Sequence, residues 1–415
     1  MYIYIYIMSK YEYVYYTALI HNDGSETPAF ESEVEPHLKF EEDRVVPLLE
    51  NSENYEMAVA SAKIDLKTLP VFIPTIKYNS GSPSDMERVE TIYEITLEYN
   101  GYSATKPVYF KAQDQTISDT APSFINGYAN YKSNYYNYYN YESFFTKVNN
   151  AIISCFTELL SVATSYNKGT VPTAFSNLSS SSKYELPYFI FDKESSLVFM
   201  NAPKTTFDST NSSDSYFSIY LNKALYRLFN SLPFLLQENT FLTLDDDSNQ
   251  TSLTKTLFKL NLNNFKNANE VELYPHLSDY STGSTKTTHF VIYQDYETLT
   301  SWSPVESIVL ASPNFPIDSN QVSAPMNFKN GIPTSQGSIR SESEILDFRT
   351  GQPVPGIIYE PSIHRWSHLK QSDSGFSRII INVYYRFKNN GQLIPVKCGI
   401  GSSMSIKMVF RKLIK

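Results

Sequence analysis

The residues that most resemble a metal site are His364 and His368, in the segment HRWSH. Four residues apart on a helix, two imidazoles would lie on one face, where they could bind zinc. No third ligand is nearby in the sequence, and Pro361 and Ser367 favour a loop. We therefore predict surface or packing histidines and no metal site.

Two other segments could carry chemistry. The run DDDSN at 245–249 offers carboxylates, but it lacks the spaced ligands and the closing Glu of a calcium loop, so we predict a solvated turn. Cys155 lies on the apolar stripe of a predicted helix, which favours a core residue over a nucleophile.

The sequence contains no nucleophile elbow, P-loop or dinucleotide fingerprint, and its six His are scattered. We predict no catalytic residues and no cofactor, hence a chain that is not an enzyme. The enzymatic alternative is a pair of carboxylates that the fold brings together, because such a pairing leaves no spacing in the sequence.

Charge is unevenly distributed along the chain. Residues 1–125 hold 9 Lys or Arg and 20 Asp or Glu, whereas the segment from Phe376 to the end holds eight basic residues and no acidic one. The alternatives are a solvated acidic face with a basic last strand, contact between oppositely charged neighbouring subunits, and a tail that meets nucleic acid. The last two would use four basic residues near the end: Lys407, Arg411, Lys412 and Lys415. So few charges release few counterions, which argues against a nucleic-acid arm.

Tyrosine is the most unusual feature of the composition, with 33 Tyr against 14 Gly. The segment NGYANYKSNYYNYYNYESFF, residues 126–145, is the densest example. Its rings are spaced as a helical stripe would require, but Asn and Tyr are mediocre helix formers, so an irregular approach to a helix is the alternative. The rings either pack locally or form a contact face, since Tyr offers a large contact area at low rotamer cost. The candidate aromatic interface consists of Tyr128, Tyr131, Tyr135, Tyr138 and Tyr139.

The elements that must position these residues fall into three regions. Residues 1–125 form an acidic β-rich region, 126–249 a mixed region with two amphipathic helices and polar loops, and 250–415 a β-rich region with a basic C-terminal strand. Within the first region, ESEVEPHLKFEEDR (31–44) is predicted as an acidic connector between strands.

Strand predictions rest on alternation and on turn residues. In ETIYEITLEY (90–99) one face carries Thr91, Tyr93, Ile95, Leu97 and Tyr99. In the last strand Ile406, Met408 and Phe410 share a face. Hairpins are predicted for YFIFD with SLVFM, and for RFKNNGQLIPV, where Asn-Gly separates two strands.

Helix predictions rest on spacings of three and four. The first helix carries a stripe of Phe144, Val148, Ile152, Cys155 and Leu159. The second carries Leu221, Leu225, Leu228, Phe229 and Leu232, and Pro233 ends it.

Composition sets the class and the compartment. At 415 residues, 41% hydrophobic and 19% charged, the chain is expected to form two or three globular subdomains. It has no apolar run long enough to span a membrane. Two cysteines do not make a disulfide framework, which favours a reducing cell interior. The start, MYIYIYIMSK, alternates as a strand does, or it precedes a protein that begins at Met8.

Four segments, in this order, resemble structural proteins of small eukaryotic viruses: YEMAVASAKIDLKTLPVFIPTI, TIYEITLEYNG, YYNYESFFTKVNNAIISCFTELL and YFSIYLNKALYRLFNSLP. The closing SMSIKMVFRKLIK is similar to the final strand of such coat proteins. The resemblance covers about half the chain and implies a virion component built on a jelly-roll-type sandwich. Together with the reducing compartment that the cysteines favour, this predicts assembly inside the host cell. The sequence departs from the pattern at the acidic N-terminal region, where many coat proteins have a basic arm.

The leading hypothesis is therefore a mainly β, non-enzymatic capsid or capsid-associated subunit. It would form homo-oligomers or join other virion subunits through Tyr-rich and charge-complementary interfaces. The alternative is a β-sandwich binding module or adhesin that recognises a glycan or a host protein through Tyr-rich loops.

Overall fold

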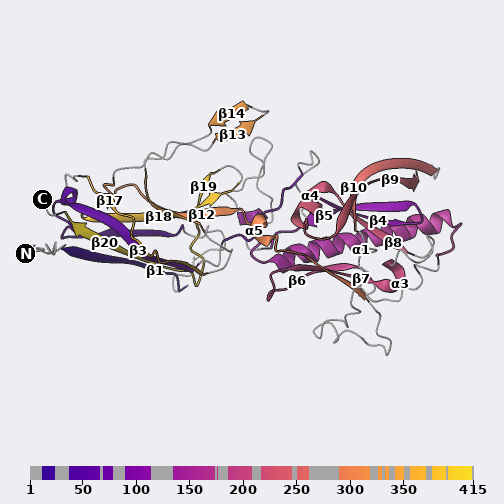
Figure 1. Cartoon of the computed structure of the whole chain (residues 1–415), viewed down its shortest axis with the longest axis horizontal. Coiled ribbons are helices and arrows are strands. Elements are labelled where there is room, and N and C mark those ends of the chain that lie inside the picture. Colours follow the sequence, from indigo (N-terminus) through magenta and orange to yellow (C-terminus); the bar gives the residue numbers. More distant parts are fainter. Residues whose placement is uncertain are drawn as a thin grey trace, which may run out of the picture. The chain divides into compact units, whose positions relative to one another are not determined.

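The chain forms two compact units, seen in a computed structural model (Figure 1). Unit 1 comprises Met1–Val71 and Ser303–Lys415, and unit 2 comprises Phe72–Trp302. Unit 2 is thus an insertion in the sequence of unit 1. The three regions predicted from the sequence, with boundaries after residues 125 and 249, mark changes in composition and stay predictions. The structure describes residues 12–23, 37–65, 69–77, 89–113, 134–172, 175, 186–207, 216–244, 250–260, 289–317, 326–329, 332–335, 342–349, 356–370, 376–388 and 391–413.

The first sheet of unit 1 has the strand order β1-β20-β3-β16, and the short β17 also pairs with β3. All its pairings are antiparallel. Tyr13 of β1 lies opposite Arg411 of β20, so strands from the two ends of the chain are neighbours. The strands span Tyr13–His21 (β1), Ser403–Lys412 (β20), Tyr55–Asp65 (β3), Gly356–Tyr359 (β16) and Ser367–His368 (β17).

The second sheet of unit 1 has the order β15-β12-β18-β19, with β2 also pairing with β18. The prediction of an acidic connector over residues 31–44 is wrong at its C-terminal end, because Lys39–Asp43 forms a strand, β2. Phe40 of β2 lies opposite Ile381, so pairing with an apolar strand makes this charged stretch a strand. The other strands span Ser343–Phe348 (β15), Val305–Ser312 (β12), Arg378–Phe387 (β18) and Leu393–Pro395 (β19). A separate hairpin joins Met326–Lys329 (β13) and Ile332–Ser335 (β14).

The order of the strands in the two sheets is that of a jelly roll. Counted along the chain, the eight principal strands of unit 1 are β1, β2, β3, β12, β15, β16, β18 and β20. Numbered one to eight in this order, the strands of the first sheet are neighbours in the order one, eight, three, six (β1, β20, β3, β16). Those of the second sheet follow the order two, seven, four, five (β2, β18, β12, β15). The prediction of a mainly β fold with a jelly-roll-like sandwich is confirmed. In the sequence, unit 2 is inserted between the third and fourth of these strands.

The core of unit 1 lies between the two sheets. Ile406, Met408 and Phe410 of β20 are fully buried, as their alternation predicts. The rings of Tyr16 in β1 and Phe40 in β2 are 6.2 Å apart, and their contact connects the two sheets. Each such buried side chain contributes about 2 kcal/mol to folding.

Unit 2 combines a long helix with two groups of strands. A closed barrel has the order β10-β8-β4-β5-β9, and a small sheet has the order β11-β7-β6. The barrel strands are Val89–Tyr99 (β4), Tyr102–Phe110 (β5), Phe217–Leu221 (β8), Phe234–Leu244 (β9) and Gln250–Leu260 (β10). The sheet strands are Tyr188–Phe191 (β6), Val198–Pro203 (β7) and His289–Tyr293 (β11).

The long helix, α1, spans Tyr141–Tyr166 and packs against β4, β5 and β6. It begins after Asn140, whose side chain accepts a hydrogen bond from the Ser143 amide at 2.9 Å. All five residues of the predicted stripe are at most 1% exposed, so the prediction of this helix is confirmed. The predicted inner face of β4 is also buried.

The second predicted helix is real but short. It spans Lys223–Leu228 (α4), because Leu221 belongs to β8 and Asn222 caps the helix by accepting from the Leu225 amide at 2.9 Å. Both predicted hairpins are confirmed, as β6–β7 and β18–β19. Other helical turns span Ser52–Asn54, Asn134–Tyr136, Lys204–Phe207 (α3) and Leu299–Trp302 (α5).

Candidate functional site

The charged residues near the C-terminus contact the acidic N-terminal region of the same chain. Arg411 Nη2 lies 2.5 Å from Glu56 Oε2, and Lys412 Nζ lies 2.9 Å from Glu12 Oε2. Arg378 Nη2 lies 2.5 Å from Glu41 Oε1. The charge asymmetry of the sequence therefore appears here as contacts within unit 1.

Arg411 forms the most enclosed of these contacts. Its guanidinium carbon lies 4.1 Å from the centre of the Trp366 ring, in a cation–π contact. Glu56, only 7% exposed, also lies 3.1 Å from Nε2 of His368. This buried carboxylate is stabilised by the arginine, which fixes β20 to β3.

The two histidines considered as zinc ligands lie beside this contact. His368 is in β17, and the His364 ring is 5.9 Å from that of Trp366. Among the described residues, no group of three or more His, Cys, Asp or Glu could hold a metal ion.

The four basic residues predicted to contact nucleic acid or an acidic partner have different surroundings. Arg411 and Lys412 are in ion pairs, and Lys407 is exposed with its Nζ 5.4 Å from the centre of the Tyr15 ring. Lys415 lies outside the described residues. Contact with nucleic acid through this strand stays a prediction.

Two of the predicted interface tyrosines are buried inside unit 2. Tyr135 and Tyr138 are 3% and 1% exposed, which agrees with the alternative that these rings pack locally. Tyr139 is half-buried. The Tyr138 amide donates to the Phe72 carbonyl at 2.9 Å. Burial raises the pKa of the Tyr138 hydroxyl above its usual range. Tyr128 and Tyr131 lie outside the described residues, where a helical stripe of tyrosines stays a prediction.

The core of unit 2 contains an aromatic cluster around Trp302, whose exposed fraction is 4%. Its indole Nε1 donates to the Leu228 carbonyl at 3.0 Å. The rings whose centres lie within 6 Å of it belong to Phe72, Tyr141, Phe144, Phe145 and Phe229. No local pattern in the sequence could predict this cluster, because its members are separated by up to 230 residues along the chain.

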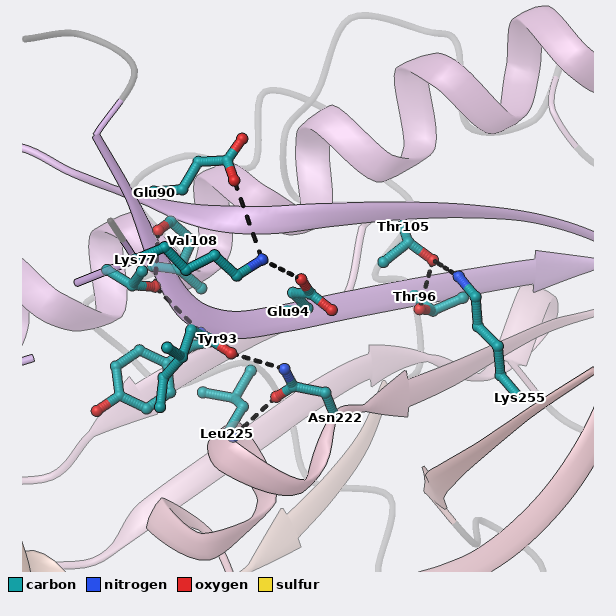
Figure 2. Close-up of polar contacts among 12 residues, drawn as sticks. Lys77, Glu90, Tyr93, Glu94, Thr96, Thr105, Val108, Asn222, Leu225 and Lys255 are labelled. Carbon is teal, nitrogen blue, oxygen red and sulfur yellow. Dashed lines mark hydrogen bonds and ion pairs between the residues drawn. The ribbon is translucent and has the colours of Figure 1, made fainter. Parts of the chain in front are cut away.

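Polar side chains connect the strands of the barrel (Figure 2). Lys77 Nζ lies 2.5 Å from Glu94 Oε1 and 3.9 Å from Glu90 Oε2. Thr96 and Thr105 bond through their hydroxyls at 2.8 Å, and Lys255 donates to Thr105 at 3.4 Å. These contacts join β4, β5 and β10, so their role is structural.

Asn222 and Cys155 also connect elements of unit 2. The Asn222 side chain donates to the Ile92 carbonyl at 2.7 Å and thus ties α4 to β4 (Figure 2). The Cys155 thiol donates to the Ile95 carbonyl at 3.2 Å, and burial raises the pKa of this thiol to about 12. A thiol with so little thiolate is a poor nucleophile at neutral pH.

Comparisons with known proteins give one family and two solved structures. The family model described as Sputnik minor capsid protein V18/19 matches residues 14–412. A chain of the Sputnik virophage structure is 19% identical, with a TM-score of 0.66, covering 97% of this chain and 98% of that one. The mavirus penton protein is 14% identical, with a TM-score of 0.54, covering 97% and 99%.

At these identities the two structures show a shared fold. No curated protein matches the sequence. No helix among the described residues is long and apolar enough to cross a membrane.

Proposed function

Because the chain belongs to the Sputnik minor capsid protein V18/19 family, we propose that it is the subunit of a penton, a ring of identical copies at a capsid vertex. Membership of this family makes the chain a structural protein of the virion that assembles with other virion subunits, and not an enzyme. The predicted capsid-type function is thereby confirmed. The penton role, the copy number and the vertex position are our proposal.

The observation that carries the proposal is the jelly roll of unit 1, with a second unit inserted between its third and fourth strands. The likeness to the mavirus penton protein covers 97% of the chain and therefore includes this insertion. A jelly roll suits a shell because its two sheets bury a core of their own and leave outer faces and edges for neighbours.

The surroundings of the charged residues support assembly through largely uncharged surfaces. Arg378, Arg411 and Lys412 have acidic partners within their own copy. Surface ion pairs are also screened by salt, whereas apolar contacts are strengthened by it. The ring is thus expected to survive high salt, unlike one held by acidic and basic ends of neighbouring chains.

Assembly inside the reducing interior of the host cell is part of the proposal. Cys155 and Cys398 are both unbridged and buried, as suits a protein that folds and assembles in a reducing compartment.

The test has two parts. Light scattering and negative-stain imaging of the purified chain, at low and high salt, should show one ring species with fivefold symmetry and five times the mass of the chain. Antibody labelling of purified virions should place the chain at the vertices. Labelling spread over the capsid faces would refute the vertex role, whatever the purified chain does.

A further inference from the structure

The edges of the two sheets in unit 1 differ in charge. In the second sheet, the edge strands β2 (KFEED) and β15 (SEILDF) carry carboxylates, whereas the short edge strand β19 (LIP) is uncharged. In the first sheet, the edge strands β1 (YVYYTALIH), β16 (GIIY) and the two-residue β17 (SH) contain no Asp, Glu, Lys or Arg. Charged side chains are a common protection of edge strands against pairing with another chain. The first sheet lacks this protection at both of its edges.

β1 offers the longer of the two unprotected edges. All nine of its residues pair with β20 in unbroken register, without a bulge. Among the described residues, no strand pairs with its other edge. A regular, uncharged strand at the edge of a sheet is a template for contact with another protein.

Large apolar side chains are exposed at the same two edges. Tyr15 and Leu19 of β1 are 61% and 65% exposed, and Ile358 of β16 is 64% exposed. Leu19 lies opposite Ser405, Ser405 opposite Lys63, and Lys63 opposite Ile358. Leu19 and Ile358 therefore lie in one row across the outer face of the sheet, at opposite margins.

A ring needs this kind of arrangement. In a closed ring of identical copies each contact joins two different surfaces, so every copy must carry both, on different sides. The margins at β1 and β16 are two such surfaces. Because neither strand carries a formal charge, bringing them together buries no unpaired charge from these strands.

We propose that the β1 margin of one copy packs against the β16 margin of the next copy, with Tyr15 and Leu19 facing Ile358. This inference rests on the proposed function, since it names the contact that closes the penton ring. The occupant of each margin is a second copy of the same chain.

The experiment uses one lysine substitution at each margin and a matched control. Leu19→Lys changes the β1 margin and Ile358→Lys changes the β16 margin. The control is Leu236→Lys in β9 of unit 2, where the side chain is 63% exposed, as open to solvent as the other two. A buried lysine charge in the contact should raise the concentration for half-assembly by at least about tenfold for each margin variant. The control should assemble as the wild type does.

Mixing the two margin variants gives the decisive result. A Leu19→Lys copy keeps an intact β16 margin, and an Ile358→Lys copy keeps an intact β1 margin, so one sound contact forms between them. At a protein concentration where each variant alone is monomeric, mass photometry of the equimolar mixture should show dimers and no rings. Formation of the dimer also demonstrates that both variants are folded.

Three outcomes would overturn the contact. Rings formed normally by either margin variant would show that the contact lies elsewhere while leaving the penton role intact. A mixture that stays monomeric would show that both residues belong to one docking face and not to two complementary margins. A wild-type chain that is monomeric at all concentrations would also refute it, and vertex labelling of virions would still test the proposed function independently.

Discussion

In unit 1 the paired strands come from opposite ends of the chain, whereas unit 2 is made from the single stretch Phe72–Trp302. The first sheet of unit 1 places β20 between β1 and β3, so the last strand completes a sheet begun by the first. Unit 2 instead packs its barrel and its small sheet against one helix, α1, whose buried face is contiguous in sequence.

The two cores also differ in chemistry. In unit 1 the inner face of β20 is built from Ile406, Met408 and Phe410, and ion pairs such as Arg411–Glu56 join its outer face to β3. In unit 2 the core around Trp302 is aromatic. Unit 1 cannot finish folding until the C-terminal strand β20 is present. Unit 2 is one continuous stretch, so all the strands and helices that it needs lie within that stretch. The comparison predicts that a deletion or substitution in one unit leaves the stability of the other unit unchanged.

Deleting residues 402–415 is expected to have the largest effect. Loss of β20 removes the central strand of the first sheet and should cost unit 1 its whole free energy of unfolding, about 5–15 kcal/mol for a domain. Unit 2 should keep its helix. Limited proteolysis with mass spectrometry should yield a protected fragment near residues 72–302. Loss of both units together would contradict the comparison.

Two matched Phe→Ala substitutions test the same separation within the full-length chain. Phe410→Ala should lower the free energy of unfolding of unit 1 by about 3–5 kcal/mol, and Phe144→Ala that of unit 2 by a similar amount. Both rings are at most 1% exposed. Denaturation followed by hydrogen exchange should assign each loss to its own unit, and a loss shared by both units in either variant would refute independence.

Alkaline pH should weaken unit 2 through its buried thiol. Burial raises the pKa of Cys155 from 9.0 to about 12, so the folded state holds this proton more tightly than the unfolded state. The resulting stabilisation is complete below pH 9 and is lost as the pH rises toward 12, with a loss of about 2 kcal/mol by pH 10.5. Urea denaturation at pH 8 and 10.5 measures it. Cys155→Ala should be less stable overall but less sensitive to this rise, and an equal sensitivity would show that other groups are responsible.

The smallest expected effect distinguishes an enclosed ion pair from an exposed one. Glu56→Gln leaves the partly buried guanidinium of Arg411 without its carboxylate and should lower the free energy of unfolding of unit 1 by about 1–2 kcal/mol. The side chains are 10% and 27% exposed. Glu12→Gln removes the exposed partner of Lys412 and should leave the stability unchanged. Equal losses in thermal denaturation would argue against this distinction.

Local periodicity was sufficient to predict several elements. The stripe from Phe144 to Leu159 predicts α1, and alternation predicts the buried faces of β4 and β20, since both periods follow from backbone geometry. The same reasoning failed for β2, where five mostly charged residues form a strand only because an apolar strand lies beside them.

The candidate interfaces were harder to predict, since exposure is a property of the folded chain. The tyrosine segment is compatible with local packing or with a contact face, and only the structure shows that Tyr135 and Tyr138 are buried in unit 2. The basic last strand suggests an acidic partner, and the structure supplies Glu56 and Glu12 within the same chain. In contrast, Leu19 and Ile358 carry no local sign of exposure or of lying in one row.

The class of fold, the long helix, the hairpins and the resemblance to viral structural proteins could be predicted from the sequence, because each depends on short-range patterns or on the order of segments. The pairing of the strands, the insertion of unit 2 in a jelly roll and the neutralisation of charges within the chain became known only from the folded structure. These depend on contacts between residues up to about 400 positions apart, such as Tyr13 and Arg411. No local period encodes them, because their free energy appears only when the distant segments meet.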